Sequence, residues 1–124
     1  MRILWICLLL GSAAPCAAGE TIAARIVVQL SPLAGFQYHE GKAVWDQLRV
    51  GDALALAREP GNLHDPNAVR VEWRGRVIGY VPRRENEAVA RQLDFGNRLG
   101  ARIVRLTRHR DPWKRVEFEI FVPL

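Results

Sequence analysis

A polar loop between two strand-like segments carries the side chains best suited to chemistry. Residues 56–71 read LAREPGNLHDPNAVRV, and the centre of this segment is dense in Pro, Gly, Asn and Asp. Such a loop lies at the surface, where flanking strands hold its polar groups in place. Asn62, His64 and Asp65 can donate or accept hydrogen bonds, but they do not supply a nucleophile with an activating base. The loop therefore indicates a binding module.

One further grouping of residues contains two histidines and a carboxylate. His39, His64 and Asp65 would suit zinc or another transition metal if the segment around His39 adjoined the loop. The simpler alternative is that no cofactor binds. Asp and Asn side chains in such loops commonly bond to the loop's own backbone in Asx turns, and Asp65 and Asn67 are placed to do so. No Ser–His–Asp arrangement, Cys nucleophile or Gly-rich phosphate loop is evident, and residues 75–84, GRVIGYVPRR, are typical of a hairpin arm. We therefore expect no enzymatic activity.

The elements that must position the loop are mostly strands. Apolar or alternating runs predict strands at 21–30, 53–58, 68–73, 77–81, 100–106 and 115–122. Ser31-Pro32 is expected to end the first, and Arg74-Gly75 to form a tight hairpin turn. The spacing of apolar residues predicts one principal helix at 85–95, stopped by Gly96, and one or two helical turns at 43–48. The sum is a mainly β fold, a small open β-barrel of five to six strands with one helix packed on it.

The first residues are typical of an export signal. Arg2 is followed by the apolar run ILWICLLL and then by small residues up to Ala18. This order predicts a signal peptide at 1–18 and a single domain at 19–124. The mature protein would be secreted or periplasmic, with no membrane attachment after cleavage, whereas a misassigned start would leave it in the cytoplasm. Both cysteines lie within 1–18, so the mature domain has no disulfide.

The charge of the chain fits an anionic partner. The sequence has 18 Lys and Arg against 13 Asp and Glu, a net charge of +5, which becomes +4 without Arg2. A positive balance of this kind favours nucleic acid, although a merely basic soluble protein has the same composition.

Several motifs in fixed order resemble the HIRAN domain, a module of helicase-like transcription factors that also occurs alone in bacteria. They are GFQY at 35–38, Gly51-Asp52, the 56–71 loop, GRVIGYVPR at 75–83 and the helix and strand that follow. The resemblance implies an OB-like barrel that binds single-stranded DNA at a free 3′-hydroxyl end. ATP hydrolysis in the family belongs to fused helicase domains, which this chain lacks.

The resemblance also implies a set of binding residues: Gln37, Tyr38, His39, Asn62, His64, Asp65, Tyr80 and Arg83. Asp65 matches the acceptor of the 3′-hydroxyl, and Arg83 matches a lysine that meets phosphate. Three positions depart from the family pattern. Gln37 replaces a basic residue, and His39 and His64 replace aromatic ones. The alternative is an exported accessory module whose loop face binds a protein, another ligand or a divalent metal; in either case we expect a monomer.

Overall fold

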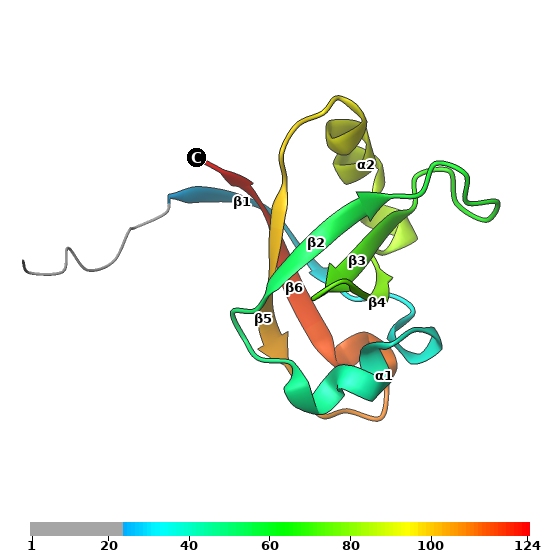
Figure 1. Ribbon diagram of the computed structural model, residues 1–124, viewed down its shortest axis with the longest axis vertical. Helices are drawn as coiled ribbons and strands as arrows, with labels where there is room; N and C mark the ends of the chain where they lie inside the picture. The colour runs from blue at the N-terminus through cyan, green and yellow to red at the C-terminus, as the bar shows by residue number, and fades with distance from the viewer. Residues whose placement is uncertain (1–23) are drawn as a thin grey trace, which may run out of the picture.

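The computed structural model describes residues 24–124, so the predicted signal peptide at 1–18 and the start of the first predicted strand lie outside the described residues. The chain forms one six-stranded antiparallel sheet with short helices around it (Figure 1). The strands are β1 (Arg25–Pro32), β2 (Ala53–Arg58), β3 (Val69–Trp73), β4 (Arg76–Tyr80), β5 (Gly100–Leu106) and β6 (Val116–Pro123). The α-helices are α1 (Gly41–Val44) and α2 (Glu87–Asp94), and the 3₁₀ helices are η1 (Phe36–Tyr38), η2 (Trp45–Gln47), η3 (Arg83–Glu85) and η4 (Pro112–Lys114).

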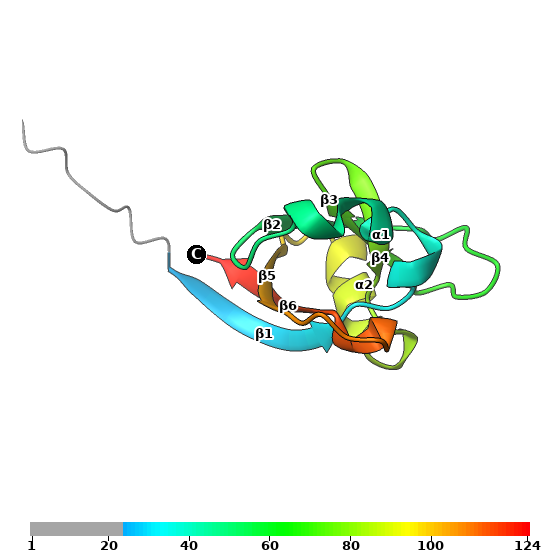
Figure 2. The same cartoon turned by 90° about the horizontal axis from the view of Figure 1, so that it is seen from below.

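The sheet curls into an open barrel, as the sequence predicted. The strand order is β1-β6-β5-β2-β3-β4, which leaves β1 and β4 as the two edges. Figure 2 shows the strands curving around an interior that α2 covers at one end. The two edges approach at one point, where Ala34 and Tyr80 exchange two backbone hydrogen bonds of 2.9 Å each. This bridge brings the segment that follows β1 against the end of β4.

Most predicted strand boundaries agree with the structure to within one residue. The prediction for the first strand was wrong at its end, because β1 runs through Ser31 and Pro32 and does not stop before them. Ser31 pairs with Phe118 and is buried, and Pro32 pairs with Glu117. Proline is tolerated here because an edge strand does not need every backbone N–H for pairing.

The principal helix is shorter than the predicted range of 85–95. Helix α2 begins at Glu87, and Arg83–Glu85 forms the separate 3₁₀ turn η3. Val89 and Ala90 are its buried residues, and Leu93 packs partly against the core. Gly96 follows the helix with a φ of 80°, the left-handed conformation in which helices commonly end. The helical turns predicted at 43–48 are present as α1 and η2.

The core fills the barrel with aliphatic side chains and three large aromatic ones, Phe36, Trp73 and Phe118. Val69, Ile78, Ile103, Phe118 and others from five strands are fully buried there. Burial of apolar side chains is the main stabilising contribution in a domain of this size. At the open side of the barrel, Gly79 lies directly beneath the backbone of Ala34, so that a Cβ at this position would collide with the Ala34 carbonyl oxygen. Gly79 therefore permits the bridge that joins the two edges.

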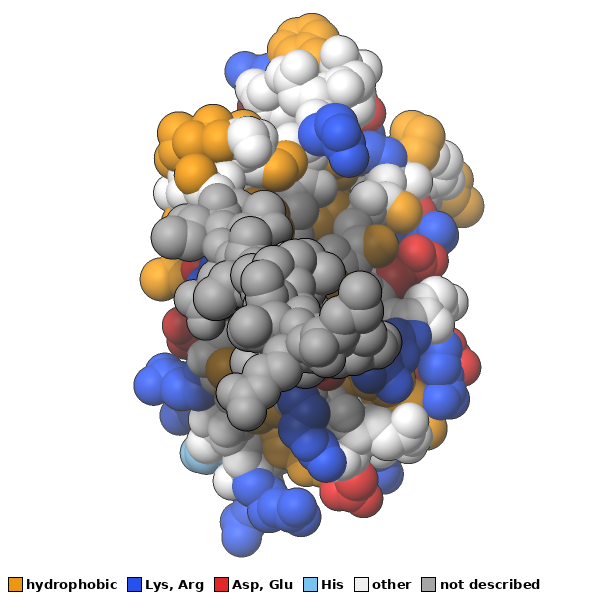
Figure 3. Space-filling model, turned by 60° about the vertical axis from the view of Figure 1, so that its left-hand side comes forward, with side chains coloured by type: hydrophobic (Ala, Val, Ile, Leu, Met, Phe, Trp, Pro, Cys, Tyr) orange, Lys and Arg blue, Asp and Glu red, His pale blue; other side chains and the backbone are white. Residues whose placement is uncertain are grey.

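The outer surface is unevenly charged. Figure 3 shows Lys and Arg side chains gathered toward the lower end of the molecule, where α1 and the β5–β6 loop lie. Higher on the outside of the sheet, Arg25 and Arg102 both pair with the largely buried carboxylate of Glu119. Within residues 24–124, no helix has the length and apolar character needed to cross a membrane.

Candidate nucleic-acid interface

The β2–β3 loop is held in shape by Asn62. Its side-chain oxygen accepts hydrogen bonds from the backbone N–H groups of His64, at 2.9 Å, and Asp65, at 3.1 Å. At the base of the loop, the Arg58 guanidinium donates to the carbonyl oxygens of Pro66 and Ala68, at 2.9 and 2.7 Å. These bonds satisfy backbone groups that a loop would otherwise leave to water. Asn62 therefore organises the loop, and His64 remains exposed at its surface.

Asp65 is fixed through both of its carboxylate oxygens. One oxygen accepts from the backbone N–H of Asn67 at 2.9 Å, which is the Asx turn considered from the sequence. The other accepts from the side-chain amide of Asn86 at 2.7 Å. Asn86 immediately precedes α2 and is only 2% exposed, yet its side chain bonds to Asp65 and not to the helix that follows. A carboxylate has about four acceptor positions, so Asp65 is held in one orientation and can still accept further hydrogen bonds.

A second carboxylate, missed by the sequence reasoning, lies next to this loop. Both oxygens of Glu59 accept from the Tyr80 hydroxyl at 2.9 Å, and Arg70 and Asn62 donate to the same carboxylate at 3.2 Å. Burial by itself would raise the pKa of Glu59, but the hydrogen bonds from Tyr80, Asn62 and Arg70 outweigh it and lower the pKa. Burial raises the pKa of Tyr80, and the hydrogen bond to Glu59 raises it further. Tyr80 is thus a neutral donor whose hydroxyl is already engaged.

The segment that the edge bridge places beside β4 carries Tyr38 and His39. The ring of Tyr38 is 80% exposed, so it contributes little to the core. The ring of His39 lies 5.2 Å from that of Tyr80, tilted by 56°. Gln37 is half-buried, and its side-chain oxygen is enclosed without a hydrogen-bond partner among the described residues. Tyr38 is therefore the residue of this segment that is free to meet a ligand.

Arg83 lies on η3 and lines a groove of about 780 Å³. The other lining residues are Pro32, Pro82, Arg84, Glu85 and Trp113. Trp113 is 46% exposed and forms one wall of this groove. A turn positions it, because the Asp111 carboxylate accepts from the backbone N–H of Trp113 at 3.0 Å and Pro112 begins η4. The Asp-Pro pair before Trp113 was the available sequence signal for a capped turn.

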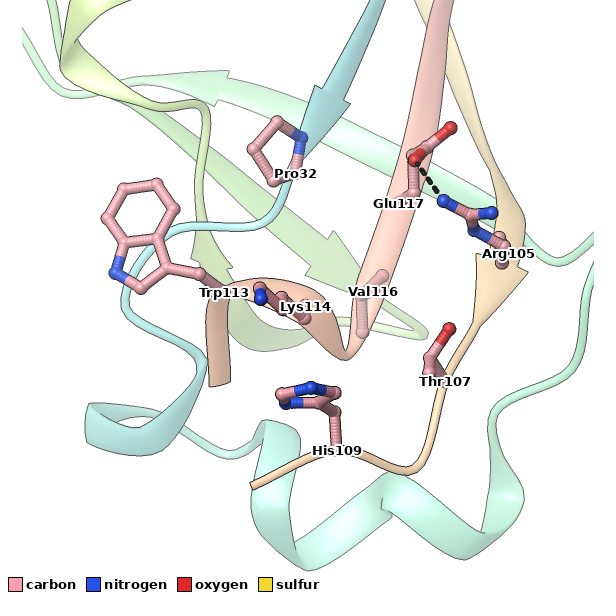
Figure 4. Close-up of a pocket in the computed structure, with 8 residues that line it drawn as sticks. All are labelled: Pro32, Arg105, Thr107, His109, Trp113, Lys114, Val116 and Glu117. Carbon is pink, nitrogen blue, oxygen red and sulfur yellow. Dashed lines mark hydrogen bonds and ion pairs between the residues drawn. The ribbon is translucent and has the colours of Figure 1, made fainter. Parts of the chain in front are cut away.

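Trp113 also lines a second groove, of about 430 Å³ (Figure 4). Pro32 borders both grooves, and Figure 4 shows His109 below Trp113 and the Arg105–Glu117 pair across the hollow. Because η1 packs against η4, the elements that carry Tyr38 and Trp113 are neighbours. The exposed rings of Tyr38 and Trp113 are therefore carried by adjacent turns, and Trp113 lines both grooves.

The structure links most of the predicted site residues into one network. His39 contacts Tyr80, Tyr80 bonds to Glu59, and Glu59 bonds to Asn62. Asn62 in turn orders the backbone of His64 and Asp65, and Asp65 bonds to Asn86 beside η3. These contacts gather the loop, the end of β4 and η3 at one end of the sheet.

The described structure does not bring His39, His64 and Asp65 together as a set of zinc ligands. Within residues 24–124, no three His, Cys, Asp or Glu side chains come together in a way that could hold a metal ion. The ring of His39 lies against that of Tyr80, and the Asp65 carboxylate accepts from Asn67 and Asn86. The third candidate ligand, His64, is exposed on the loop.

Comparison with known proteins agrees with this fold. The family model for the HIRAN domain matches residues 26–124. A crystal structure of a protein from Lactobacillus plantarum is similar with a TM-score of 0.68 and 31% sequence identity, over 79% of this chain and 94% of that one. The crystal structure of the HIRAN domain of human HLTF is similar with a TM-score of 0.59 and 17% identity, over 78% of each chain. No curated protein sequence matched the chain.

The likeness to human HLTF supports the fold alone at this identity, whereas the family match covers nearly all of the described residues. The chain belongs to the HIRAN domain family, a family of nucleic-acid-binding modules.

Proposed function

We propose that this protein binds single-stranded DNA at a 3′-hydroxyl end and performs no catalysis. The observation that carries the proposal is a groove lined by Arg83, Arg84 and the exposed ring of Trp113, with the exposed ring of Tyr38 on the neighbouring turn η1. Unpaired bases stack on aromatic faces, and arginines hold the adjoining phosphates. This combination of rings and cations is the usual means by which proteins hold a single strand.

Asp65 would give the site its preference for an end. Its carboxylate is held by Asn67 and Asn86, and it can accept another hydrogen bond. A terminal sugar hydroxyl can donate that bond. A terminal phosphate carries negative charge and would be repelled by Asp65. The carboxylate would therefore distinguish a hydroxyl end from a phosphorylated end.

The departures from the family pattern have separate consequences for this proposal. Gln37 supplies no cation, so Arg83 and Arg84 would carry the phosphate contacts. His64 is exposed on the loop and offers a smaller ring than tyrosine. His39 lies on Tyr80 and would support the site from behind. We therefore expect binding that is weaker than a fully aromatic site would give, with the same preference for a hydroxyl end.

The test is fluorescence anisotropy with short single-stranded DNA that ends in either a 3′-hydroxyl or a 3′-phosphate, at low and moderate salt. Wild-type protein should prefer the hydroxyl end. The decisive variant is Asp65→Asn, which keeps an oxygen for the Asn67 N–H but removes the charge. It should lose the preference mainly by binding the phosphorylated end more tightly.

Asp65→Ala serves as the second variant, because it removes both loop contacts as well as the charge. Circular dichroism and thermal denaturation would identify any loss of folding in either variant. Equal binding of wild-type protein to both ends, with a steep dependence on salt, would refute end recognition and leave only a basic surface. Absence of binding at low salt would refute the whole proposal.

The predicted export signal stays a prediction, since residues 1–18 lie outside the described residues. We propose secretion or periplasmic location on the sequence pattern alone. Fractionation of cells that express the full chain, followed by N-terminal sequencing, would test it. An uncleaved protein in the cytoplasm would contradict it.

A further inference from the structure

A small basic pocket lies between α1 and the β5–β6 loop, and it shares none of its lining residues with the predicted end site. Its volume is about 210 Å³, and it is lined by Phe36, Lys42, Trp45, Arg108, His109 and Arg115. Phe36 and Trp45 form its apolar wall, with their rings edge to face at 5.8 Å. The remaining four lining residues are basic, and none of the six is acidic.

The cations of this pocket are poorly neutralised. Among the described residues, no carboxylate lies within ion-pair distance of Lys42 or Arg115. Arg108 approaches Asp46 only at 3.9 Å, and both side chains are almost fully exposed. An exposed pair of this kind contributes little and is readily replaced by a stronger partner. The pocket therefore attracts anions.

Arg115 is preorganised to donate hydrogen bonds. Its Nε donates to the carbonyl oxygen of His109 at 2.9 Å, and one terminal nitrogen donates to that of Arg110 at 3.4 Å. The guanidinium also lies 5.7 Å from the centre of the Phe36 ring. A guanidinium has five N–H donors, so others stay available while the side chain is held in place. A fixed donor loses less conformational entropy when it binds an anion.

His109 connects this pocket to the groove beside Trp113, since it lines both. The Nδ1 atom of His109 accepts from the backbone N–H of Asp111 at 2.9 Å, which places the proton of the neutral ring on Nε2. Nε2 is then a donor. Figure 4 shows His109 projecting from the loop that separates the Trp113 groove from α1. The basic surface thus continues from Arg83 past Trp113 and His109 to Lys42 and Arg108.

We propose that this pocket binds a backbone phosphate of the same nucleic-acid strand, several nucleotides from the end. The inference rests on the proposed function for its ligand, but it concerns a different set of residues. The end site would fix the 3′ terminus, and Lys42, Arg108, His109 and Arg115 would hold the strand further along. Longer oligonucleotides should therefore bind more tightly than short ones because they reach both positions.

The experiment compares oligonucleotides of about 3 and about 12 nucleotides, a range that spans the usual footprints of small single-strand-binding barrels. The variant is Lys42→Gln with Arg108→Gln, which removes two exposed cations and leaves Arg115 and the loop intact. It should bind the short DNA like wild type and the long DNA about five- to tenfold more weakly at low salt. The slope of log affinity against log salt for the long DNA should fall by about 1.4, the value for two single-strand phosphate contacts.

A matched control removes two other exposed cations, Arg74→Gln with Arg98→Gln, which lie in the β3–β4 turn and after α2 and line none of the grooves described above. It should keep the affinity of wild type for both DNA lengths. Equal losses in the two double variants, or no loss with the pocket variant, would overturn the inference. Competition by inorganic phosphate at equal ionic strength separates a site for the free ion from a site for the strand. If phosphate abolishes the affinity gain of the long DNA at a concentration that leaves binding of the short DNA unchanged, the pocket is a site for the free ion. That result would also overturn the inference.

The proposed end site and this pocket can fail independently. Loss of end preference with a preserved length effect would refute the end site alone. Tight binding of the short DNA without any gain for the long DNA would refute the pocket alone. Failure of both lengths to bind would refute both.

Discussion

Replacing Tyr38 by alanine should separate binding from folding. Its ring is 80% exposed, so about a fifth of its surface is buried by the fold. For a buried aromatic side chain of roughly 200 Å², that fifth is about 40 Å², worth about 1 kcal/mol at most at about 25 cal/mol per Å². Stacking on one base contributes about 1–3 kcal/mol. Tyr38→Ala should therefore weaken DNA binding about 5- to 150-fold while the folded state is largely kept.

The assay is anisotropy of labelled single-stranded DNA, with thermal denaturation of the same samples. Tyr38→Phe keeps the ring face and should bind within about twofold of wild type, because the stacking surface is unchanged. Phe95→Ala is the control, since Phe95 is 72% exposed, follows α2 and lines none of the grooves described above. Wild-type affinity in Tyr38→Ala, or an equal loss in Phe95→Ala, would refute the assignment of Tyr38 as a stacking platform.

Three other substitutions, one of them with a control, test the hydrogen-bond network, the bridge between the sheet edges and the loop. Glu59→Gln should lower the free energy of unfolding by about 1–3 kcal/mol at neutral pH. Because the folded state lowers the pKa of Glu59 below 4.5, its contribution is present above pH 4.5 and is lost as the pH falls through the lowered pKa. Urea denaturation should therefore show wild type and variant converging in acid, and a constant difference would contradict this. Gly79→Ala should lower the melting temperature by an amount equivalent to about 1–3 kcal/mol, since the added methyl group collides with the backbone of Ala34. Gly61→Ala, in open space, should leave the melting temperature nearly unchanged, and equal shifts would rule out the steric explanation. His64→Tyr should tighten DNA binding about fivefold by enlarging the exposed ring, and unchanged affinity would place His64 outside the DNA path.

Much of the fold was predictable because its signals are local. The boundaries of β2 and β5 coincide with the predicted ranges, since alternation and turn residues mark them directly. The Arg74-Gly75 turn was also predictable, and both residues have positive φ, as a tight hairpin requires. The extension of β1 through Pro32 was missed, because its pairing with β6 depends on residues about 85 positions later in the chain.

The site was only partly predictable. Asn62, His64 and Asp65 were found because they crowd into one loop between two strands. Glu59, Asn86 and Trp113 were missed, since an isolated Glu, Asn or Trp carries no sign of its distant partner. Asn86 bonds to a residue 21 positions before it, and Tyr80 bonds to Glu59 across the same separation. Such contacts arise only when β2, β3 and β4 come together.

The sequence by itself determined a mainly β domain, its turns and the polar loop, because strand periodicity and turn chemistry act over a few neighbouring residues. Only the tertiary structure decided which side chains face solvent and which are held by others. It exposed Tyr38, enclosed the oxygen of Gln37 and engaged Tyr80 with Glu59. It also placed Trp113 beside Arg83, although 30 positions separate them in the chain. The physical reason is that the curvature of the sheet and the closing bridge at Ala34 and Tyr80 bring distant segments together, and no local pattern encodes their separation in space.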